Sequence, residues 1–305
     1  QLLCKSLVVL ACVSISAFIA EAQHIERIRA ELEFQSKTSF MGSVTIEENG
    51  QTLLNEAYGL ANIEQNIPNS TTTKYRIASI TKQFTAAAIL LLAERDLLST
   101  DQLIGEYLRE IPAEWESISI HHLLTNSSGI PDNFSYESPL DKFKPLSLPE
   151  DFEFAMNQPL LFEPGTAFAY SNTGYWILGY IIESVSAKSY EEFISTNIFS
   201  VLGMNDSGYE ENLAVISGMA AGYSKEGGVF TTASYIDMSR PFAAGSLYST
   251  TEDLMKWSAA LFSGEVLTAE SLRKLITPYL GEYAMGLYSQ TSNGRQKIWH
   301  NGGID

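Results

Sequence analysis

Ser79-Ile80-Thr81-Lys82 begins a segment that continues as Gln83-Phe84-Thr85-Ala86-Ala87-Ala88-Ile89-Leu90-Leu91-Leu92-Ala93. This continuation is apolar nearly all round, which predicts a buried core helix that runs to about Leu98. Residues three apart lie on one face of a helix, so the hydroxyl of Ser79 and the amine of Lys82 are predicted to be neighbours. A lysine with reduced solvation loses its proton more easily and can activate a serine for acyl transfer through a covalent intermediate.

The four-residue pattern occurs a second time, as Ser271-Leu272-Arg273-Lys274. That copy lies in the charged, amphipathic segment 268–276, which is typical of a solvated surface helix. For Ser79 the alternative interpretation is an ordinary residue at the start of a helix, with a lysine nearby by chance. Partners elsewhere in the chain must distinguish the two interpretations.

Length and composition set limits on the fold and the partners. The chain has 305 residues, of which 45% are hydrophobic, enough for one large domain or two lobes. The net charge of −17 and the pI near 4.6 disfavour nucleic acid and anionic membranes as partners. The four histidines form no His-Glu-x-x-His motif, so a zinc hydrolase is not expected, and we expect neither a metal nor another cofactor.

The first residues are typical of an export signal. An apolar run over residues 7–20 leads into Ala20-Glu21-Ala22, an A-x-A cleavage site, which predicts a signal peptide over residues 1–22. The mature protein is then periplasmic or secreted and has no stable membrane span. A membrane anchor is one alternative, although the run is short for a span, and a lipid anchor at Cys12 is another. The other cysteine, Cys4, also lies in this segment, so the mature chain is expected to have no disulfide and no thiol nucleophile.

The mature chain begins with signals for a helix and a hairpin. The spacing of apolar residues predicts a helix over 24–34. Two strands, over 40–46 and 52–58, flank Asn49-Gly50, which is a strong hairpin signal.

Helical signals dominate the middle of the chain. A capping box at 99–102 predicts a helix through Leu108. Further helices are expected over residues 119–124, 147–156, 172–185, 190–202 and 249–262. Residues 132–150 are expected to form a long loop, and residues 205–245 show no clear period.

The order of these elements predicts an α/β (α+β) fold with a single domain over residues 23–305. Its antiparallel sheet lobe is expected over about 23–98 and 246–305, with a mostly helical insertion over about 99–245.

Two further stretches supply groups that fit the chemistry of Ser79 and Lys82. Tyr170-Ser171-Asn172 places a phenol and an amide two residues apart, just before a predicted helix. A tyrosine beside a lysine can take a proton from serine as a phenolate, and an asparagine can hold a substrate carbonyl or orient the lysine. His300-Asn301-Gly302-Gly303 ends a predicted strand with glycines, where a substrate backbone can approach closely and a backbone N–H can complete an oxyanion hole. Taken one at a time, an ordinary tyrosine among 15 and a packed histidine are the alternatives.

Taken together and in this order, the S-x-x-K, Y-x-N and H-x-G stretches resemble the serine β-lactamase and penicillin-binding protein (DD-peptidase) superfamily. The resemblance is to the branch that contains class C β-lactamases, D-alanyl-D-alanine carboxypeptidases and esterases, and it extends from about Ser39 to Asp305. Three more stretches are similar to family patterns: Leu123–Pro131, Leu202–Ser207 and Ala244–Leu254. The resemblance implies a β-lactamase/transpeptidase-like fold, in which helices flank an antiparallel sheet.

The resemblance also implies roles for the residues that match the first two motifs. Ser79 would be the acylated nucleophile, and Lys82 would tune both Ser79 and Tyr170. Tyr170 would act as general base in acylation and then as acid to the leaving group. Asn126 stands where the family often has histidine, a change from which we expect little effect on the chemistry.

Substrate contacts would come from Asn172, His300 and Gly302, as the resemblance implies. The backbone N–H groups of Ser79 and Gly303 would form the oxyanion hole. His300 replaces the lysine of the family's K-T-G motif, and histidine is only partly charged near neutral pH. Binding of anionic ligands is therefore expected to weaken as the pH rises through the histidine range, and β-lactam hydrolysis is disfavoured.

The predicted activity is that of a serine hydrolase acting on amide or ester bonds of a small-molecule or peptidoglycan-type substrate. Examples are a D-Ala-D-Ala-type peptide, a D-amino acid peptide or an ester. The alternative is a penicillin-binding sensor that is acylated with little or no turnover, which the intact Ser79, Lys82 and Tyr170 disfavour. An α/β-hydrolase is not expected, because no Gly-x-Ser-x-Gly occurs. In the family further strands follow the third motif, so we expect C-terminal strands to be missing from a chain that stops at Asp305.

Overall fold

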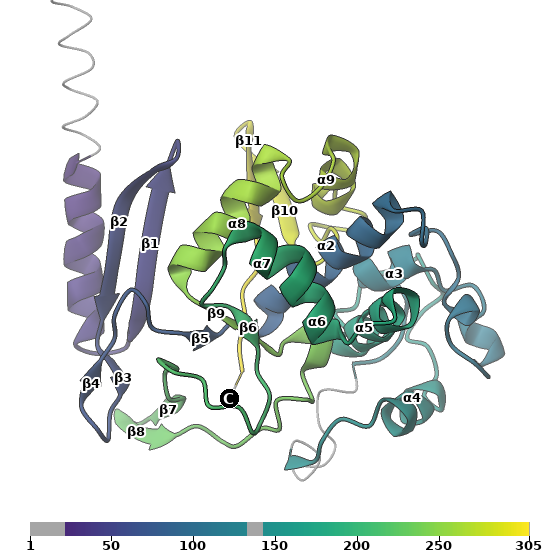
Figure 1. Cartoon of the computed structure of the whole chain (residues 1–305), viewed down its shortest axis with the longest axis horizontal. Helices are drawn as coiled ribbons and strands as arrows, with labels where there is room; N and C mark the ends of the chain where they lie inside the picture. The colour runs from purple at the N-terminus through teal and green to yellow at the C-terminus, as the bar shows by residue number, and fades with distance from the viewer. Residues whose placement is uncertain (1–21, 133–142, 305) are drawn as a thin grey trace, which may run out of the picture. The chain divides into compact units, whose positions relative to one another are not determined.

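The computed structural model describes residues 22–132 and 143–304. The predicted signal peptide, apart from its last residue, and residues 133–142 of the predicted long loop lie outside these ranges. The chain divides into two compact units, one formed by the part up to Thr73 with Gly218–Ala221 and the other by the remainder. Figure 1 labels the strands of both units and the helices α2 to α9. Within the described ranges, every helix is too short or too polar to cross a membrane.

The first unit contains the hairpin that the Asn49-Gly50 turn predicts. β1 (Gly42–Glu48) and β2 (Gln51–Tyr58) pair antiparallel, and the two turn residues have φ of 52° and 76°. Positive φ at both positions is the turn geometry that matches the twist of a hairpin. A helix over residues 22–36 precedes β1, so the predicted helix and both predicted strands are confirmed.

Charged and aromatic side chains join the helix of the first unit to its hairpin. Arg29 Nε donates a hydrogen bond to Glu56 Oε1 at 2.8 Å, and Glu56 Oε2 accepts one from the hydroxyl of Tyr58 at 2.7 Å. A second, shorter antiparallel pair follows, formed by β3 (Leu60–Asn62) and β4 (Ile67–Pro68).

The second unit is organised around the apolar helix that follows Ser79. A 3₁₀ turn, η1 (Ala78–Ile80), leads directly into α2 (Thr81–Glu94). Most side chains of α2 are buried along its whole length, which confirms the predicted core helix. The helix ends before Leu98, because the chain turns out of the helix at Asp96, whose φ is 55°.

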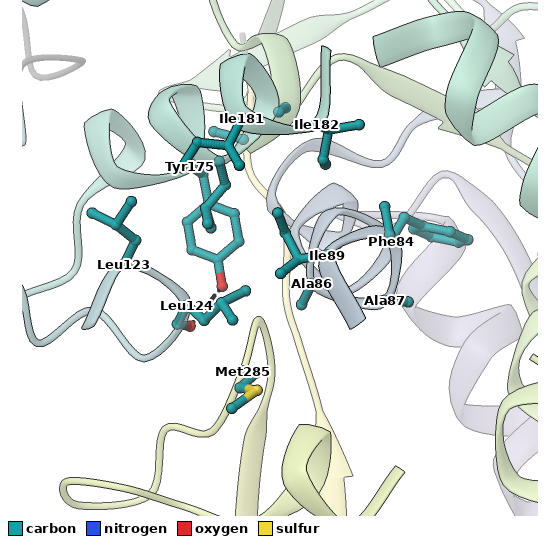
Figure 2. Close-up of a cluster of buried hydrophobic side chains, with 14 of the residues drawn as sticks. Phe84, Ala86, Ala87, Ile89, Leu123, Leu124, Tyr175, Ile181, Ile182 and Met285 are labelled. Atoms are coloured by element: carbon teal, nitrogen blue, oxygen red, sulfur yellow. Dashed lines mark hydrogen bonds between the residues drawn. The ribbon is translucent and has the colours of Figure 1, made fainter. Parts of the chain in front are cut away.

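Two of the predicted helices pack around α2. α5 (Asn172–Ser186) contacts both α2 and α3 (Ile120–Leu124), and the three helices share one hydrophobic core (Figure 2). Tyr175 of α5 is fully buried, and its hydroxyl donates a hydrogen bond to the carbonyl oxygen of Leu124 at 2.8 Å. This contact satisfies the one polar atom of an otherwise apolar side chain.

The other predicted helices of this unit are also present. They are α4 (Leu148–Met156), α6 (Tyr190–Ile194), the π-helical turn η5 (Ser195–Phe199), α7 (Ser200–Leu202) and α8 (Thr251–Ser263). The single helix predicted over 190–202 is thus a continuous run with a π-helical turn in its middle.

The prediction of a helix after the capping box at 99–102 is wrong. The backbone N–H of Ser99 does donate to Gln102 Oε1 at 2.6 Å, as a capping contact would. However, Leu103 is extended and forms a β-bridge with Ser119, so only a 3₁₀ turn, η2 (Ile104–Glu106), follows. The tertiary bridge overrides the local helix signal.

The strands of the second unit form small antiparallel sheets. β5 (Tyr75–Arg76) and β6 (Gly208–Tyr209) flank β9 (Leu247–Ser249), which places the strand before Ser79 beside residues far along the chain. β10 (Tyr288–Ser292) and β11 (Arg295–Trp299) form a hairpin that leads directly to His300.

One hairpin was not predicted from the sequence. β7 (Tyr223–Glu226) and β8 (Val229–Thr232) pair across Gly227-Gly228 in the segment where no period was found. The sequence of β8, Val-Phe-Thr-Thr, does not alternate between apolar and polar residues, and every residue of the strand is exposed, so periodicity could not detect it.

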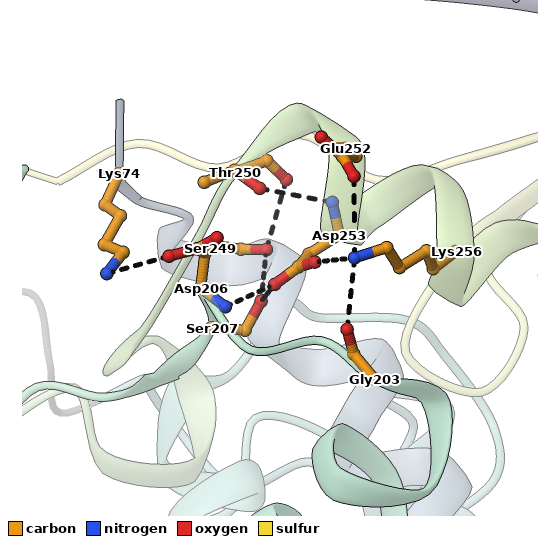
Figure 3. A network of polar contacts seen from close by, with 9 residues as sticks. All are labelled: Lys74, Gly203, Asp206, Ser207, Ser249, Thr250, Glu252, Asp253 and Lys256. Carbon is orange, nitrogen blue, oxygen red and sulfur yellow. Dashed lines mark hydrogen bonds and ion pairs between the residues drawn. The ribbon is translucent and has the colours of Figure 1, made fainter. Parts of the chain in front are cut away.

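A buried carboxylate joins two of the stretches that resemble family patterns. Asp253, only 1% exposed, accepts hydrogen bonds from the backbone N–H of Asp206 at 2.8 Å and from the hydroxyl of Ser207 at 2.9 Å (Figure 3). Lys256 Nζ lies 2.8 Å from its other oxygen. The charge of Asp253 is therefore paired, and its part in this structure is to fix the start of α8 to the segment before β6.

Alanine at Gly286 should destabilise the chain more than alanine at Gly294. Both glycines have a φ of 73°, where an L-residue costs about 1–2 kcal/mol. A Cβ at Gly286 would lie 2.5 Å from the carbonyl oxygen of Lys82, whereas nothing lies within 4 Å of a Cβ at Gly294. We expect the clash to add roughly 1–3 kcal/mol, measured by urea unfolding of both variants. Equal losses would show that the packing against Lys82 is not tight.

Candidate active site

The side chain of Lys82 is fully buried and brings several of the predicted site residues together. Its Nζ lies 3.2 Å from Ser79 Oγ, 2.7 Å from Asn172 Oδ1 and 2.9 Å from the carbonyl oxygen of Ala244. The same atom lies 4.8 Å from the centroid of the Tyr170 ring. Ala244 belongs to η6 (Phe242–Ala244), so elements far apart in the chain meet at one nitrogen atom.

Burial determines the charge of Lys82. Removal from water disfavours the ammonium and lowers the pKa of Lys82 from 10.5 to about 7, although the negative charge of Asp132 opposes this shift. Near neutral pH a large share of Lys82 is therefore neutral. Its lone pair is then available for the proton of Ser79, 3.2 Å away.

Asn126 holds the segment that carries Tyr170. Its backbone carbonyl accepts a hydrogen bond from the N–H of Ala169 at 3.0 Å, and its Oδ1 accepts one from the N–H of Ser171 at 3.1 Å. Asn126 is buried with a φ of 53°, a conformation that asparagine adopts more readily than most residues. The structure thus gives this residue a supporting role on both sides of Tyr170, which the sequence did not indicate.

Tyr170 is held as a neutral phenol. Its hydroxyl is buried and has no hydrogen-bond partner among the residues that the structure describes. Burial raises the pKa of Tyr170, and the nearby hydroxyl of Ser79 offsets the rise only in part. The phenolate that the sequence interpretation invoked is therefore disfavoured, because it would be a poorly solvated charge. A neutral phenol can still donate its proton.

His300 is also uncharged near neutral pH, which corrects the expectation of a partly charged ring. Burial lowers the pKa of His300 to about 4, and the charge of Lys82 acts in the same direction. His300 Nδ1 donates to the carbonyl oxygen of Asn301 at 2.5 Å, which leaves Nε2 as an acceptor for the hydroxyl of Tyr283, 3.4 Å away. The predicted loss of anionic ligands as the pH rises from 5 to 8 can no longer be assigned to His300.

The segment after β11 approaches the residues before Ser79 through a glycine. A Cβ at Gly302 would lie 2.2 Å from the carbonyl oxygen of Ile77 and 3.1 Å from Cβ of Ala78. Ala78 itself has a φ of 46°, a conformation that costs about 1–3 kcal/mol in a residue other than glycine. Gly302 therefore packs against the strained turn that presents Ser79, whereas Gly303 has open space beside its Cα.

The second S-x-x-K stretch lies on α9 (Ala269–Ile276), and its lysine has another partner. Lys274 Nζ pairs with Glu270 Oε1 at 3.1 Å, and both side chains are at least half exposed. This confirms the solvated surface helix expected there. Within the described residues, no group of three or more histidine, cysteine, aspartate or glutamate side chains could hold a metal ion.

Three contributors to the site were not identified from the sequence. Asp132 accepts hydrogen bonds from Asn172, the Ala244 carbonyl binds Lys82, and Tyr283 faces His300. Asp132 directly follows the family-like stretch that ends at Pro131, and Ala244 begins another such stretch. Proximity to these stretches therefore pointed to Asp132 and Ala244, whereas Tyr283 lies outside all of them.

Comparison with known proteins gives matches over most of the chain. The family model described as Beta-lactamase matches residues 35–294. Penicillin-binding protein 4* of Bacillus subtilis (strain 168) is 30% identical over 289 residues, which cover 88% of this chain and 64% of that protein. The chain spans about two thirds of the length of the first curated relatives that it matches.

Solved structures agree with these matches. The penicillin binding protein from Bacillus halodurans is 31% identical with a TM-score of 0.77, covering 88% of this chain and 84% of that one. The D-amino acid amidase from Ochrobactrum anthropi SV3, complexed with L-phenylalanine amide, is 25% identical with a TM-score of 0.80, covering 92% and 85%. The α/β fold class implied by the resemblance is thereby confirmed.

Alanine at Gly302 should impair the site, whereas alanine at Gly303 should not. The Gly302→Ala side chain would overlap the carbonyl oxygen of Ile77, so the turn that presents Ser79 must shift. A displacement of about 1 Å at a reacting group can cost roughly 100-fold in rate. We expect a fall of that order in the rate at which a fluorophosphonate labels Ser79, with little change for Gly303→Ala, which keeps its backbone N–H. Equal labelling of both variants would contradict the close approach.

Proposed function

We propose that this chain is a serine hydrolase that forms an acyl-enzyme on Ser79. The chain belongs to the beta-lactamase family, in the class C-like branch of penicillin-binding proteins and D-amino acid amidases. The observation that carries the proposal is the buried Nζ of Lys82, 3.2 Å from Ser79 Oγ, with a pKa lowered to about 7. A hydroxyl beside an amine of that pKa meets the general requirement for an activated nucleophile.

Acylation uses neutral Lys82 as the base. Nζ takes the proton of Ser79 while Oγ attacks the substrate carbonyl carbon, and the electron pair of the C=O bond moves onto its oxygen. We assign stabilisation of that oxyanion to the backbone N–H groups of Ser79 and Gly303. Support comes from the place of Ser79 at a helix start, where N–H groups lack partners within the helix, and from the open space beside Gly303.

Collapse of the tetrahedral intermediate requires a proton for the leaving group, and Tyr170 supplies it. The phenol donates its proton to the departing amine or alcohol as the C–N or C–O bond breaks. The proton that Lys82 took from Ser79 then passes to Tyr170, whose raised pKa favours the neutral phenol. In deacylation, neutral Lys82 takes a proton from water as the water oxygen attacks the acyl carbon, and that proton returns to Ser79 Oγ as the acyl C–O bond breaks, which releases the acid and restores Ser79.

We propose D-amino acid amides or peptides, peptidoglycan-type peptides and simple esters as the substrate class. The likeness to a solved D-amino acid amidase supports this choice. The neutral ring of His300 supports the amides and esters within this class, because a hydrogen-bonding imidazole does not hold a substrate carboxylate as a permanent cation would. β-Lactam hydrolysis is accordingly not the activity that we propose.

Labelling of Ser79 tests the proposal directly. Treatment with a fluorophosphonate, followed by peptide mass spectrometry, should place the adduct on Ser79 and nowhere on Ser271. Ser79→Ala should lose the labelling, whereas Ser271→Ala, the matched change in the other S-x-x-K stretch, should keep it. Labelling that survives in Ser79→Ala would refute the mechanism. A stable penicillin adduct without turnover of esters or D-amino acid amides would favour the penicillin-binding sensor.

The pH dependence of kcat/KM should report the charge of Lys82. Only neutral Lys82 can take the proton of Ser79, so kcat/KM for a nitrophenyl ester should rise with pH and level off above a pKa near 7. His300, with a pKa near 4, and Tyr170, with a raised pKa, should add no further step between pH 5.5 and 8.5. Lys82→Ala should lose the step together with roughly 100- to 10,000-fold in rate. A rate that falls with rising pH over this range would mean that the ammonium form is required.

A further inference from the structure

We infer, on the basis of the proposed function, that Asp132 is a positioning residue that holds the Asn172 amide with its oxygen toward Lys82 and so directs the lone pair of Lys82 at Ser79. The backbone N–H of Asn172 donates to Asp132 Oδ1 at 3.2 Å. Asn172 Nδ2 lies 3.2 Å from Asp132 Oδ2 and 3.4 Å from Oδ1. Asp132 thus binds both the backbone and the amide nitrogen of Asn172.

The orientation of the Asn172 amide follows from its two ends. An ionised carboxylate can only accept hydrogen bonds, so the NH₂ end of Asn172 must face Asp132. The oxygen end then faces Lys82 and accepts its proton at 2.7 Å. Without Asp132 nothing in this contact would prevent a flip of the amide, which would turn the NH₂ group toward Lys82.

The flip matters because a neutral amine has two N–H groups and one lone pair. Asn172 Oδ1 accepts one N–H of Lys82 and the Ala244 carbonyl accepts the other, at 2.7 and 2.9 Å. The lone pair is then left for the hydroxyl of Ser79, 3.2 Å away. A flipped Asn172 would donate to that lone pair and compete with the proton of Ser79.

The charge of Asp132 acts on Lys82 as well. Its carboxylate opposes the effect of burial and keeps the pKa of Lys82 higher than burial alone would leave it. Among the residues that the structure describes, the other titratable groups near Lys82 are Tyr170 and Tyr175, whose rings lie 4.8 and 5.3 Å from Nζ, and His300. Burial keeps all of these neutral near pH 7, so Asp132 is the charged group that sets the pH at which Lys82 becomes a base.

A purely structural role is the competing explanation. Asp132 binds the first backbone N–H of α5, so its loss could loosen the helix without any specific effect on Lys82. The chain offers a matched control in Asp237, whose Oδ1 accepts from the amide of Asn212 at 2.6 Å and which has no contact with Lys82 among the described residues. Asp237→Asn makes the same chemical change in another aspartate–asparagine pair.

The experiment compares kcat/KM against pH for D132N, D132A and D237N in the full chain, with thermal unfolding as a check on folding. Loss of the Asp132 charge should lower the pKa of Lys82, because the ammonium loses its attraction to the carboxylate. The pH at which kcat/KM rises should therefore be lower in D132N and D132A than in the unchanged protein. D132N should also lose plateau rate, because an amide at position 132 can donate as well as accept and no longer forces the oxygen of Asn172 toward Lys82. D132A should lose about 10- to 100-fold. D237N should resemble the unchanged protein in both respects.

A double-mutant cycle with Asn172 separates positioning from general destabilisation. If Asp132 acts through Asn172, D132A should cost little plateau rate in an N172A background. The inference would be overturned if the rate losses of D132A and N172A multiplied in the double variant. It would also be overturned if the pH at which kcat/KM rises were unchanged in both D132N and D132A.

A readout that needs no catalysis keeps the two proposals distinguishable. NMR titration of protein labelled with ¹³Cε-lysine reads the pKa of Lys82 directly, and this pKa should fall in D132N but not in D237N. If the unchanged protein is not labelled on Ser79, the proposed function fails, whatever the NMR shows. If Ser79 is labelled but the pKa of Lys82 is the same in D132N, only the role of Asp132 fails.

Discussion

The burial of the Lys82 ammonium beside Ser79 is the constraint on which the rest of the site depends. A fall in pKa from 10.5 to about 7 corresponds to a cost on the order of 5 kcal/mol for holding the charged form, at about 1.4 kcal/mol per unit. This is the net cost, because the pKa of Lys82 already includes the negative charge of Asp132, which opposes the effect of burial. Because the charged form remains disfavoured, a lysine becomes a base near neutral pH.

The protein can keep the Lys82 side chain buried at this free-energy cost only if the surrounding structure is rigid and well packed. The apolar body of α2 is buried along its length, and Gly286 lies so close to the carbonyl of Lys82 that even a methyl group would not fit. The backbone is strained where the site is assembled, with φ of 46° at Ala78 before the nucleophile and 41° at Phe242 before the Ala244 carbonyl. Strain of this kind persists only where neighbouring packing over-determines the conformation. The core of the second unit and the chemistry of Ser79 are thus parts of one arrangement.

Local sequence predicted the parts of this arrangement that depend on local physics. Apolar periodicity located α2, and the Asn49-Gly50 dipeptide located the first hairpin. Both features depend on residues that are close together in the sequence. The helix expected after Ser99 failed because a β-bridge from Leu103 to Ser119 competes with it. The order of the three motifs and the family resemblance suggested the site residues. The structure brings Ser79, Asn172 and Tyr170 around Lys82, with the ring of His300 beside that of Tyr170. The contact of Asp132 with Asn172 spans 40 residues, and no local pattern records it.

The protonation states of His300 and Tyr170 were the property that was predicted least well from the sequence, and the reason is physical. A histidine and a tyrosine have ordinary pKa values in the absence of surroundings, so sequence alone suggested a partly charged His300 and a phenolate at Tyr170. Both side chains lie where water is largely excluded, and both are driven to their neutral forms. The same exclusion of water that leaves Lys82 neutral and able to accept a proton therefore removes the charge from His300 and keeps Tyr170 protonated. Desolvation thus sets the protonation states of Lys82, His300 and Tyr170. The amide of Asn172, whose NH₂ group faces Asp132, orients the lone pair of Lys82 toward Ser79.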